Sequence, residues 1–155
     1  MFRTPSTLPS VAPAPKAAPA VEGTLPVTRT ADFAVAPPQP GGPQLDAEKL
    51  IAYHLALELQ ALCSSLAPGA NHILRDQLDR ASLSVVLNLA EGAGRYSRKQ
   101  KRHFYGIARG SATEVAAAVD VVRVRQLAAP GACYTVRSLA VRVVQLLTKL
   151  DASLA

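Results

Sequence analysis

The amino-acid sequence predicts an all-α fold, an up-and-down four-helix bundle that follows a disordered N-terminal arm. After residue 45, apolar residues recur at steps of three and four in four successive segments, the spacing of one face of an α-helix. Glycine or proline interrupts the pattern at Pro68-Gly69, at Gly92 and Gly94, and at Pro130-Gly131. No segment alternates as a β-strand does. Short connections of this kind join antiparallel neighbours in a bundle.

Residues 1–45 differ in composition from the rest of the chain. Ten of the twelve prolines lie before Gln44, among Ala, Thr and Ser and without an apolar period. We therefore interpret residues 1–45 as a disordered Pro/Ala-rich arm and residues 46–155 as the bundle. The prolines would break an amphipathic targeting helix, and no apolar run is long enough for a signal peptide or a membrane span. We expect a cytoplasmic protein that does not enter membranes.

The first two helices are expected over residues 46–66 and 73–91. The apolar seam of the first helix comprises Ile51, Leu55, Leu59, Leu62 and Leu66. The seam of the second helix comprises Leu74, Leu78, Ala81, Val85 and Leu89. Gly92 and Gly94 are expected to end the second helix as left-handed caps.

The third helix is expected to begin at Ser97, because Ser97 to Gln100 fits a capping box. Gly106 and Gly110 lie one turn apart on this helix, and we expect them to let another helix approach closely. The seam of the third helix comprises Phe104, Ile107, Ala108, Ser111, Val115, Ala118 and Val122. The fourth helix follows Pro130-Gly131. Its seam comprises Val136, Leu139, Val143, Leu147 and Leu150.

The second helix is apolar on most of its surface but carries one polar stripe. At 3.6 residues per turn, Gln77, Ser84, Asn88 and Glu91 fall on one side of it. A buried polar group without a partner costs about 1–3 kcal/mol, so these side chains need partners. We expect a structural polar network that sets helix register and subunit geometry. Its predicted members are Arg80, Ser84, Asn88, Glu91, Ser111 and Glu114.

Positive charge clusters around the predicted start of the third helix. The chain has 17 Lys and Arg against 11 Asp and Glu. Cations at a helix N-terminus oppose the helix dipole, which suggests an external anion, and phosphate is the obvious one. The predicted nucleic-acid-binding residues are Arg95, Arg98, Lys99, Lys101, Arg102, Tyr105 and Arg109. The competing interpretation is a solvated charged face, or one that pairs with acidic groups of a neighbouring subunit.

The sequence gives little support for catalysis, metal binding or a cofactor. Neither Glu91 nor Glu114 has a His three residues further on, as in di-iron bundles. The three histidines stand apart from one another and from Cys63 and Cys133, which we expect to be buried as small apolar side chains. The serines lack a glycine-elbow context. We expect no enzyme, no metal and no cofactor.

Several helices have more apolar surface than one small core can use. The second helix, for example, carries Leu83, Leu87 and Ala90 on the side away from its seam. Monomers seldom expose large contiguous apolar patches, so we expect self-association. The alternative is a loose bundle with scattered surface alanines and leucines.

Two runs of sequence resemble the signature of a known family. They are Arg80-Ala81-x-x-Ser84-Val85-x-x-Asn88-Leu89-Ala90-Glu91-Gly92-x-Gly94-Arg95 and Phe104-x-x-Ile107-Ala108-x-Gly110-Ser111-x-x-Glu114. The runs are similar to the 23S rRNA intervening-sequence proteins, bacterial four-helix bundles first noticed as open reading frames in the intervening sequences of large-subunit rRNA. The resemblance implies an up-and-down bundle, with relatives that form ring-shaped homopentamers.

A structurally similar branch is the accessory variability determinant of diversity-generating retroelements, a basic pentameric barrel that partners a reverse transcriptase and its RNA. That role transfers to this chain by fold only. The family's aromatic-proline turn between the first two helices is Ala67-Pro68-Gly69 here, and the proline-rich arm lies outside the family pattern.

Together these features predict a non-enzymatic homo-oligomer, a pentamer by the resemblance. Its basic surface would bind RNA, DNA or a nucleic-acid-processing protein, for example as a reverse-transcriptase accessory protein. Binding would be electrostatic and largely independent of sequence. The alternative is a structural scaffold or interaction module without nucleic-acid binding, in which the proline-rich arm acts as a tether.

Overall fold

The computed structural model describes residues 44–67 and 69–155. Its elements are a short 3-10 helix, η2 (Asp46–Lys49), and the α-helices α1 (Ile51–Leu66), α2 (His72–Gly94), α3 (Arg98–Val124) and α4 (Pro130–Ser153). The described residues contain no β-strand, so the predicted all-α fold is confirmed. Within the same residues, no helix combines the length and apolar character needed to cross a membrane. The predicted arm, residues 1–45, lies almost wholly outside the described part.

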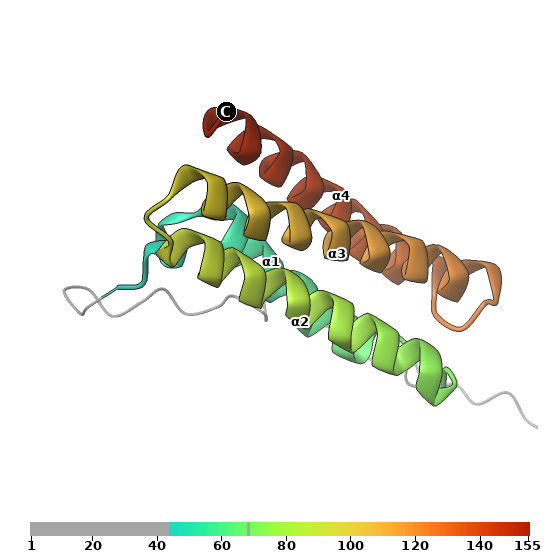
Figure 1. Cartoon of the computed structure of the whole chain (residues 1–155). Coiled ribbons are helices and arrows are strands. Elements are labelled where there is room, and N and C mark those ends of the chain that lie inside the picture. Colours follow the sequence, from blue (N-terminus) through green and yellow to red (C-terminus); the bar gives the residue numbers. More distant parts are fainter. Residues whose placement is uncertain (1–43, 68) are drawn as a thin grey trace, which may run out of the picture.

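The four α-helices run up and down and pack around one core (Figure 1). Each helix packs against its neighbour in sequence, and α1 also packs against α4, which closes the bundle. Helix α3 has the most extensive contacts, with α2 on one side and α4 on the other. The largest fully buried side chains include Leu59, Leu78, Leu89, Val115 and Leu147.

The first helix differs from its prediction in both its start and its buried face. The predicted helix over residues 46–66 is interrupted at Leu50, whose extended backbone (φ −97°, ψ 122°) separates η2 from α1. Ile51, a predicted seam residue, is 69% exposed, whereas Ala52 and Ala56 are buried. The small alanine side chains let α1 lie close to its neighbours. The predicted seam of this helix is therefore wrong at its N-terminal end.

Helix α2 continues through the glycines that were expected to end it. The helix extends to Gly94, and the next residue, Arg95, has φ −78°. The prediction of left-handed glycine caps is therefore wrong. A Cβ atom at Gly92 would lie 2.6 Å from Cε1 of Tyr105 and 3.1 Å from Cβ of Phe104. Gly92 thus serves close packing of α3 against α2.

Helix α3 begins where the sequence predicts but without the predicted capping box. Ser97 is the N-cap residue, yet its side chain makes no capping hydrogen bond. The close helix approach expected at Gly106 and Gly110 is also wrong within this chain, because the space beside both is open. Ile107, a predicted seam residue, is 40% exposed. This side of α3 lies on the surface of the protein.

The predicted seam of α2 is confirmed, because all five of its residues are buried. In α4, Val136, Val143 and Leu147 are buried, and the other two predicted seam residues pack partly buried against the core. Cys63 and Cys133 are buried free thiols, as expected. Burial raises the pKa of the Cys63 thiol to about 12.

Candidate nucleic-acid interface

The predicted cationic cluster lies at the end of the bundle where the turn from α2 to α3 meets the C-terminal end of α4. Two contacts define this position. Nζ of Lys101 donates a hydrogen bond to the carbonyl oxygen of Ala93 in α2, and Arg102 contacts Asp151 in α4. We call this surface the basic end. It comprises Arg95, Arg98, Lys99, Lys101, Arg102 and His103.

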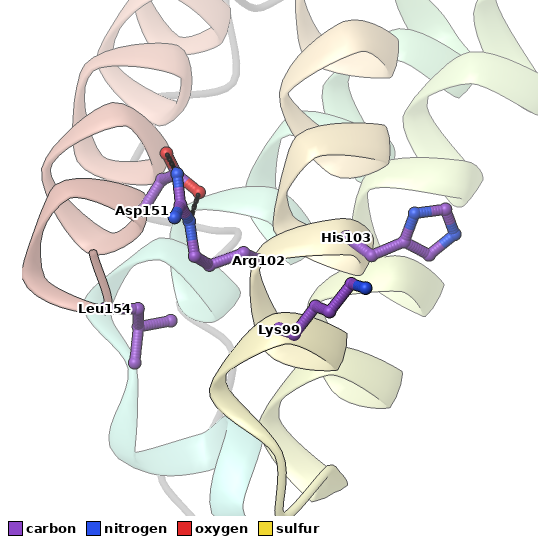
Figure 2. A pocket seen from close by; sticks show the side chains of 5 residues that line it. All are labelled: Lys99, Arg102, His103, Asp151 and Leu154. Atoms are coloured by element: carbon purple, nitrogen blue, oxygen red, sulfur yellow. Dashed lines mark hydrogen bonds and ion pairs between the residues drawn. The ribbon is translucent and has the colours of Figure 1, made fainter.

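Two arginines of the basic end already bind carboxylates of the same chain. Nε and Nη2 of Arg102 donate to the two carboxylate oxygens of Asp151, at 3.0 and 3.3 Å (Figure 2). Arg95 pairs with Glu91 and lies over the ring of Phe104, with its guanidinium carbon 4.9 Å from the ring centroid. The Arg102–Asp151 pair joins α3 to the end of α4, and the Arg95–Glu91 pair lies beside the α2–α3 turn. They also reduce the positive charge offered to a ligand.

Lys101 has a structural partner as well. It is half-buried, and its ammonium group lies 3.0 Å from the carbonyl oxygen of Ala93. Helix α2 has no basic residue in its own last turn, so Lys101 supplies the positive charge that favours a helix C-terminus. Lys101 thus stabilises the helix pair.

Arg98 and Lys99 differ from these three cations. Both are exposed, and within residues 44–67 and 69–155 neither side chain has a hydrogen-bond or ion-pair partner. Lys99 lines an open hollow of about 460 Å³ together with Arg102, His103, Asp151 and Leu154. Figure 2 shows Lys99 and His103 extending from the side of α3 away from Asp151. Arg98 and Lys99 are therefore exposed cations that a ligand could reach.

Tyr105, the predicted aromatic contact, is only 3% exposed. Its ring fills the space beside Gly92, and this burial raises the pKa of its hydroxyl. The prediction that Tyr105 lies on an exposed strip is therefore wrong. Arg109, in contrast, is exposed on α3. The pKa of Asp151 is lowered mainly by the hydrogen bond from Arg102, and the charge of Arg109 contributes to the same effect.

The predicted polar network forms along the contact between α2 and α3. Oγ of Ser84 lies 2.8 Å from Oγ of Ser111, so α2 and α3 are joined directly. Nδ2 of Asn88 donates to the carbonyl oxygen of Ser84 at 2.8 Å and to its hydroxyl at 3.1 Å. All three side chains are half-buried. The Ser84–Ser111 bond links the two helices at this level, and Asn88 holds the Ser84 hydroxyl from within α2.

A second part of the network lies nearer the surface. Nη2 of Arg80 donates to Oε1 of Gln77 at 2.6 Å, and Gln77 donates in turn to Glu114 of α3. Arg80, Glu114 and Glu91 are exposed, and Glu91 pairs with Arg95. The expectation of a buried network is therefore wrong for these three residues.

A further group of charged residues lies at the far end of α3 from the basic end, and none of its members is among the predicted site residues. Oδ1 and Oδ2 of Asp120 accept hydrogen bonds from Nε of Arg137 at 3.1 and 3.0 Å, and Oδ1 also accepts one from Arg123 at 3.4 Å. Tyr134 is 75% exposed beside them. We call this place the Tyr134 hollow. It has a volume of about 350 Å³ and is lined by Asp120, Arg123, Cys133, Tyr134 and Arg137.

One signal in the sequence could have revealed this group. Tyr134 and Arg137 lie three residues apart, on the side of α4 away from its apolar seam, so both reach the surface one turn apart. The donors at both ends of α3 are guanidinium, ammonium and imidazole groups, which suit anions. Among the described residues, no group of three or more His, Cys, Asp or Glu is placed to hold a metal ion.

The fold and the charge distribution define the class of protein, an up-and-down four-helix bundle with cationic surfaces along its third helix. Comparison with protein-family models then gives the family. The model described as 23S rRNA-intervening sequence protein matches residues 48–149, about two thirds of the chain. The chain therefore belongs to the 23S rRNA-intervening sequence protein family, as the signature in α2 and α3 predicts. No curated protein matches the chain.

Proposed function

We propose that this protein is a non-catalytic, self-assembling bundle of the cytoplasm that binds nucleic acid through its basic end. The observation that carries the proposal is the state of Arg98 and Lys99. Both lie in the first turn of α3, where the helix dipole disfavours positive charge, and no carboxylate of the described residues pairs with them. A phosphate backbone would remove this unfavourable interaction. RNA is the first ligand to test, because the family is named after intervening sequences of 23S rRNA.

The ion pairs reduce the number of cations that are available to bind phosphates. Arg95 and Arg102 each keep a carboxylate, and Lys101 is bound to the end of α2. Arg98, Lys99 and Arg109 are left for phosphates, so we expect about three phosphate contacts per subunit. In the plot of log affinity against log salt, these three contacts alone would give a slope of about −2 for single strands and about −3 for duplexes.

The test is the fluorescence anisotropy of a labelled RNA oligonucleotide, measured over a range of salt concentrations. The double variant Arg98→Ala/Lys99→Ala should bind more weakly, with a slope smaller by about one to two. The matched control is Arg142→Ala/Lys149→Ala, which removes the same charge from exposed positions of α4. An equal loss of affinity in both variants, or no binding at low salt, would contradict the proposal.

Self-assembly is the second part of the proposal, and it rests on the outer face of α2 and α3. Leu83, Leu87 and Ile107 are exposed there, and Gly106 and Gly110 face open space. A glycine inside a helix costs about 0.5–1 kcal/mol relative to alanine, and no contact within the described residues offsets that cost. A second copy of the chain would bury the apolar side chains and use the close approach that the glycines permit.

The resemblance to ring-forming relatives makes five the expected number of subunits. Light scattering on the purified full chain should give a multiple of the 16.3 kDa chain mass. A clean monomer at micromolar concentration would contradict this part of the proposal.

A scaffold without nucleic-acid binding is the competing function. It is favoured by the Arg95–Glu91 and Arg102–Asp151 pairs, which show that carboxylates of the same chain already satisfy part of the cluster. The anisotropy experiment separates the two functions, because a pure scaffold would assemble normally and leave the labelled RNA unbound.

A further inference from the structure

The Tyr134 hollow contains two guanidinium groups that share a single carboxylate. Arg123 of α3 and Arg137 of α4 both donate to Asp120, so the group keeps a net positive charge. Both arginine side chains remain about half exposed. The shared carboxylate holds them in place, so little side-chain freedom is lost when an anion binds.

Tyr134 adds an exposed aromatic ring to this cationic group. Tyr105 is buried and Tyr53 is half-buried, whereas Tyr96, between α2 and α3, and Tyr134 are both exposed. Of these two, Tyr134 is 75% exposed and lines the same hollow as the two arginines. An aromatic face beside arginines is the combination that binds single-stranded nucleic acid: bases stack on the ring, and cations meet the phosphates. An acidic polypeptide would use the arginines but would gain nothing from the ring.

We infer that the Tyr134 hollow is a base-stacking site, in which an unpaired base of a single strand lies on Tyr134 while Arg123 and Arg137 face its phosphates. This inference rests on the proposed function and specifies the kind of nucleic acid bound. Bases in a duplex are stacked on one another and cannot lie on the ring. The site therefore selects single strands over duplexes.

The position of the hollow fits a strand that also reaches the basic end. Two ion pairs cross the α3–α4 contact, Arg137–Asp120 and Arg102–Asp151. Their members on α3, Arg102 and Asp120, are 18 residues apart. At 1.5 Å per residue this is about 27 Å, and exposed Arg109 lies between them. A strand of several nucleotides would span both places, whereas a very short one would occupy a single place.

Fluorescence of a single tryptophan tests the inference directly. The chain has no tryptophan, so the variant Tyr134→Trp carries a unique reporter. Adding a 15-nucleotide oligouridylate should quench its fluorescence as a base stacks on the indole. The matched control is Thr135→Trp, an exposed position one residue further along α4 and about 100° around the helix, which should show no quenching.

Affinity gives a second measurement. Tyr134→Leu should weaken the binding of the oligouridylate about 5- to 150-fold and leave duplex binding unchanged, whereas Tyr134→Phe should retain wild-type binding. Circular dichroism of each variant verifies that the bundle is folded.

Three results would overturn the inference. In the first, anisotropy shows that the strand binds the Tyr134→Trp protein, but the tryptophan fluorescence is not quenched. The basic end alone would then hold the strand, and the proposed function would stand. Another is equal quenching by a duplex. The third is poly-glutamate displacing the strand from the hollow as well as unlabelled oligouridylate does, which would assign the hollow to an acidic polypeptide. Absence of any strand binding in anisotropy would contradict the proposed function itself, and the inference with it.

Discussion

Gly92 is the residue at which the packing of α2 against α3 leaves no room for a side chain. A Cβ atom there would meet the ring of Tyr105 at 2.6 Å. We expect Gly92→Ala to lower the free energy of unfolding by about 1–3 kcal/mol, because the buried ring must move. Urea denaturation followed by circular dichroism measures this change.

The matched control for Gly92→Ala is Gly131→Ala in the first turn of α4, where the space beside the glycine is open. It should leave stability unchanged or raise it by up to about 1 kcal/mol. Equal stability of the two variants would show that Tyr105 can move at no cost.

The pKa of the Asp120 carboxylate depends on the contact between α3 and α4. The hydrogen bond from Arg137 lowers its pKa most. Burial, the next largest effect, raises the pKa, and the charges of Arg137 and Arg123 lower it further, so the net shift is downward. Since the folded pKa lies below the ordinary value of 3.8, the stabilisation is complete above that pH and is lost as the pH falls through the folded pKa. NMR titration of the carboxyl carbon should find the lowered pKa. Arg137→Gln should raise it toward 3.8, and an unchanged pKa in this variant would exclude the pair in solution.

Residue positions in the candidate interface were predictable only in part. The cluster at the start of α3 is visible in the sequence, but its pairing is not, because Arg102 and Asp151 are 49 residues apart along the chain. Tyr105 was placed wrongly because its position on the helix lies near the border between the buried and exposed sides. Packing of the Tyr105 ring against Gly92 places this residue on the buried side of α3.

At the scale of elements, the helices themselves follow from the apolar period. The buried faces of α2 and α4 could be predicted because polar residues border the apolar seam of each helix. Helix α1 has leucine and alanine around most of its circumference, so the period alone cannot select the buried side. The structure buries the alanine side, which permits closer packing.

The glycines illustrate a similar limit for elements. Sequence alone shows that Gly92, Gly106 and Gly110 lack side chains, but it does not show which element packs against each of them. Gly92 admits a ring of α3, whereas Gly106 and Gly110 face outward. The difference depends on which sides of α2 and α3 face each other, which the Ser84–Ser111 hydrogen bond and the core contacts determine together.

At the scale of the whole molecule, the exposed face of α2 and α3 governs the expected assembly. Leu87→Glu should dissociate the oligomer without loss of helix content, because a charge would replace an apolar contact between copies. The control is Ile51→Glu, which places the same charge at an exposed apolar position of α1. Asn88→Leu should also keep the helices but change the subunit number, because it removes the polar link to Ser84. Light scattering measures each mass, and an unchanged mass for Leu87→Glu would place the interface elsewhere.

The order in which the helices pack has a kinetic consequence. Apart from α1 with α4, the extensive helix contacts join elements that follow one another along the chain. Proteins dominated by such local contacts have low contact order and fold quickly, since little chain entropy is lost before each contact forms. Joining α1 to α4 closes a loop of most of the bundle and carries the largest entropic cost. We expect the contact between α1 and α4 to form last during folding and to open first when amide hydrogens exchange with solvent.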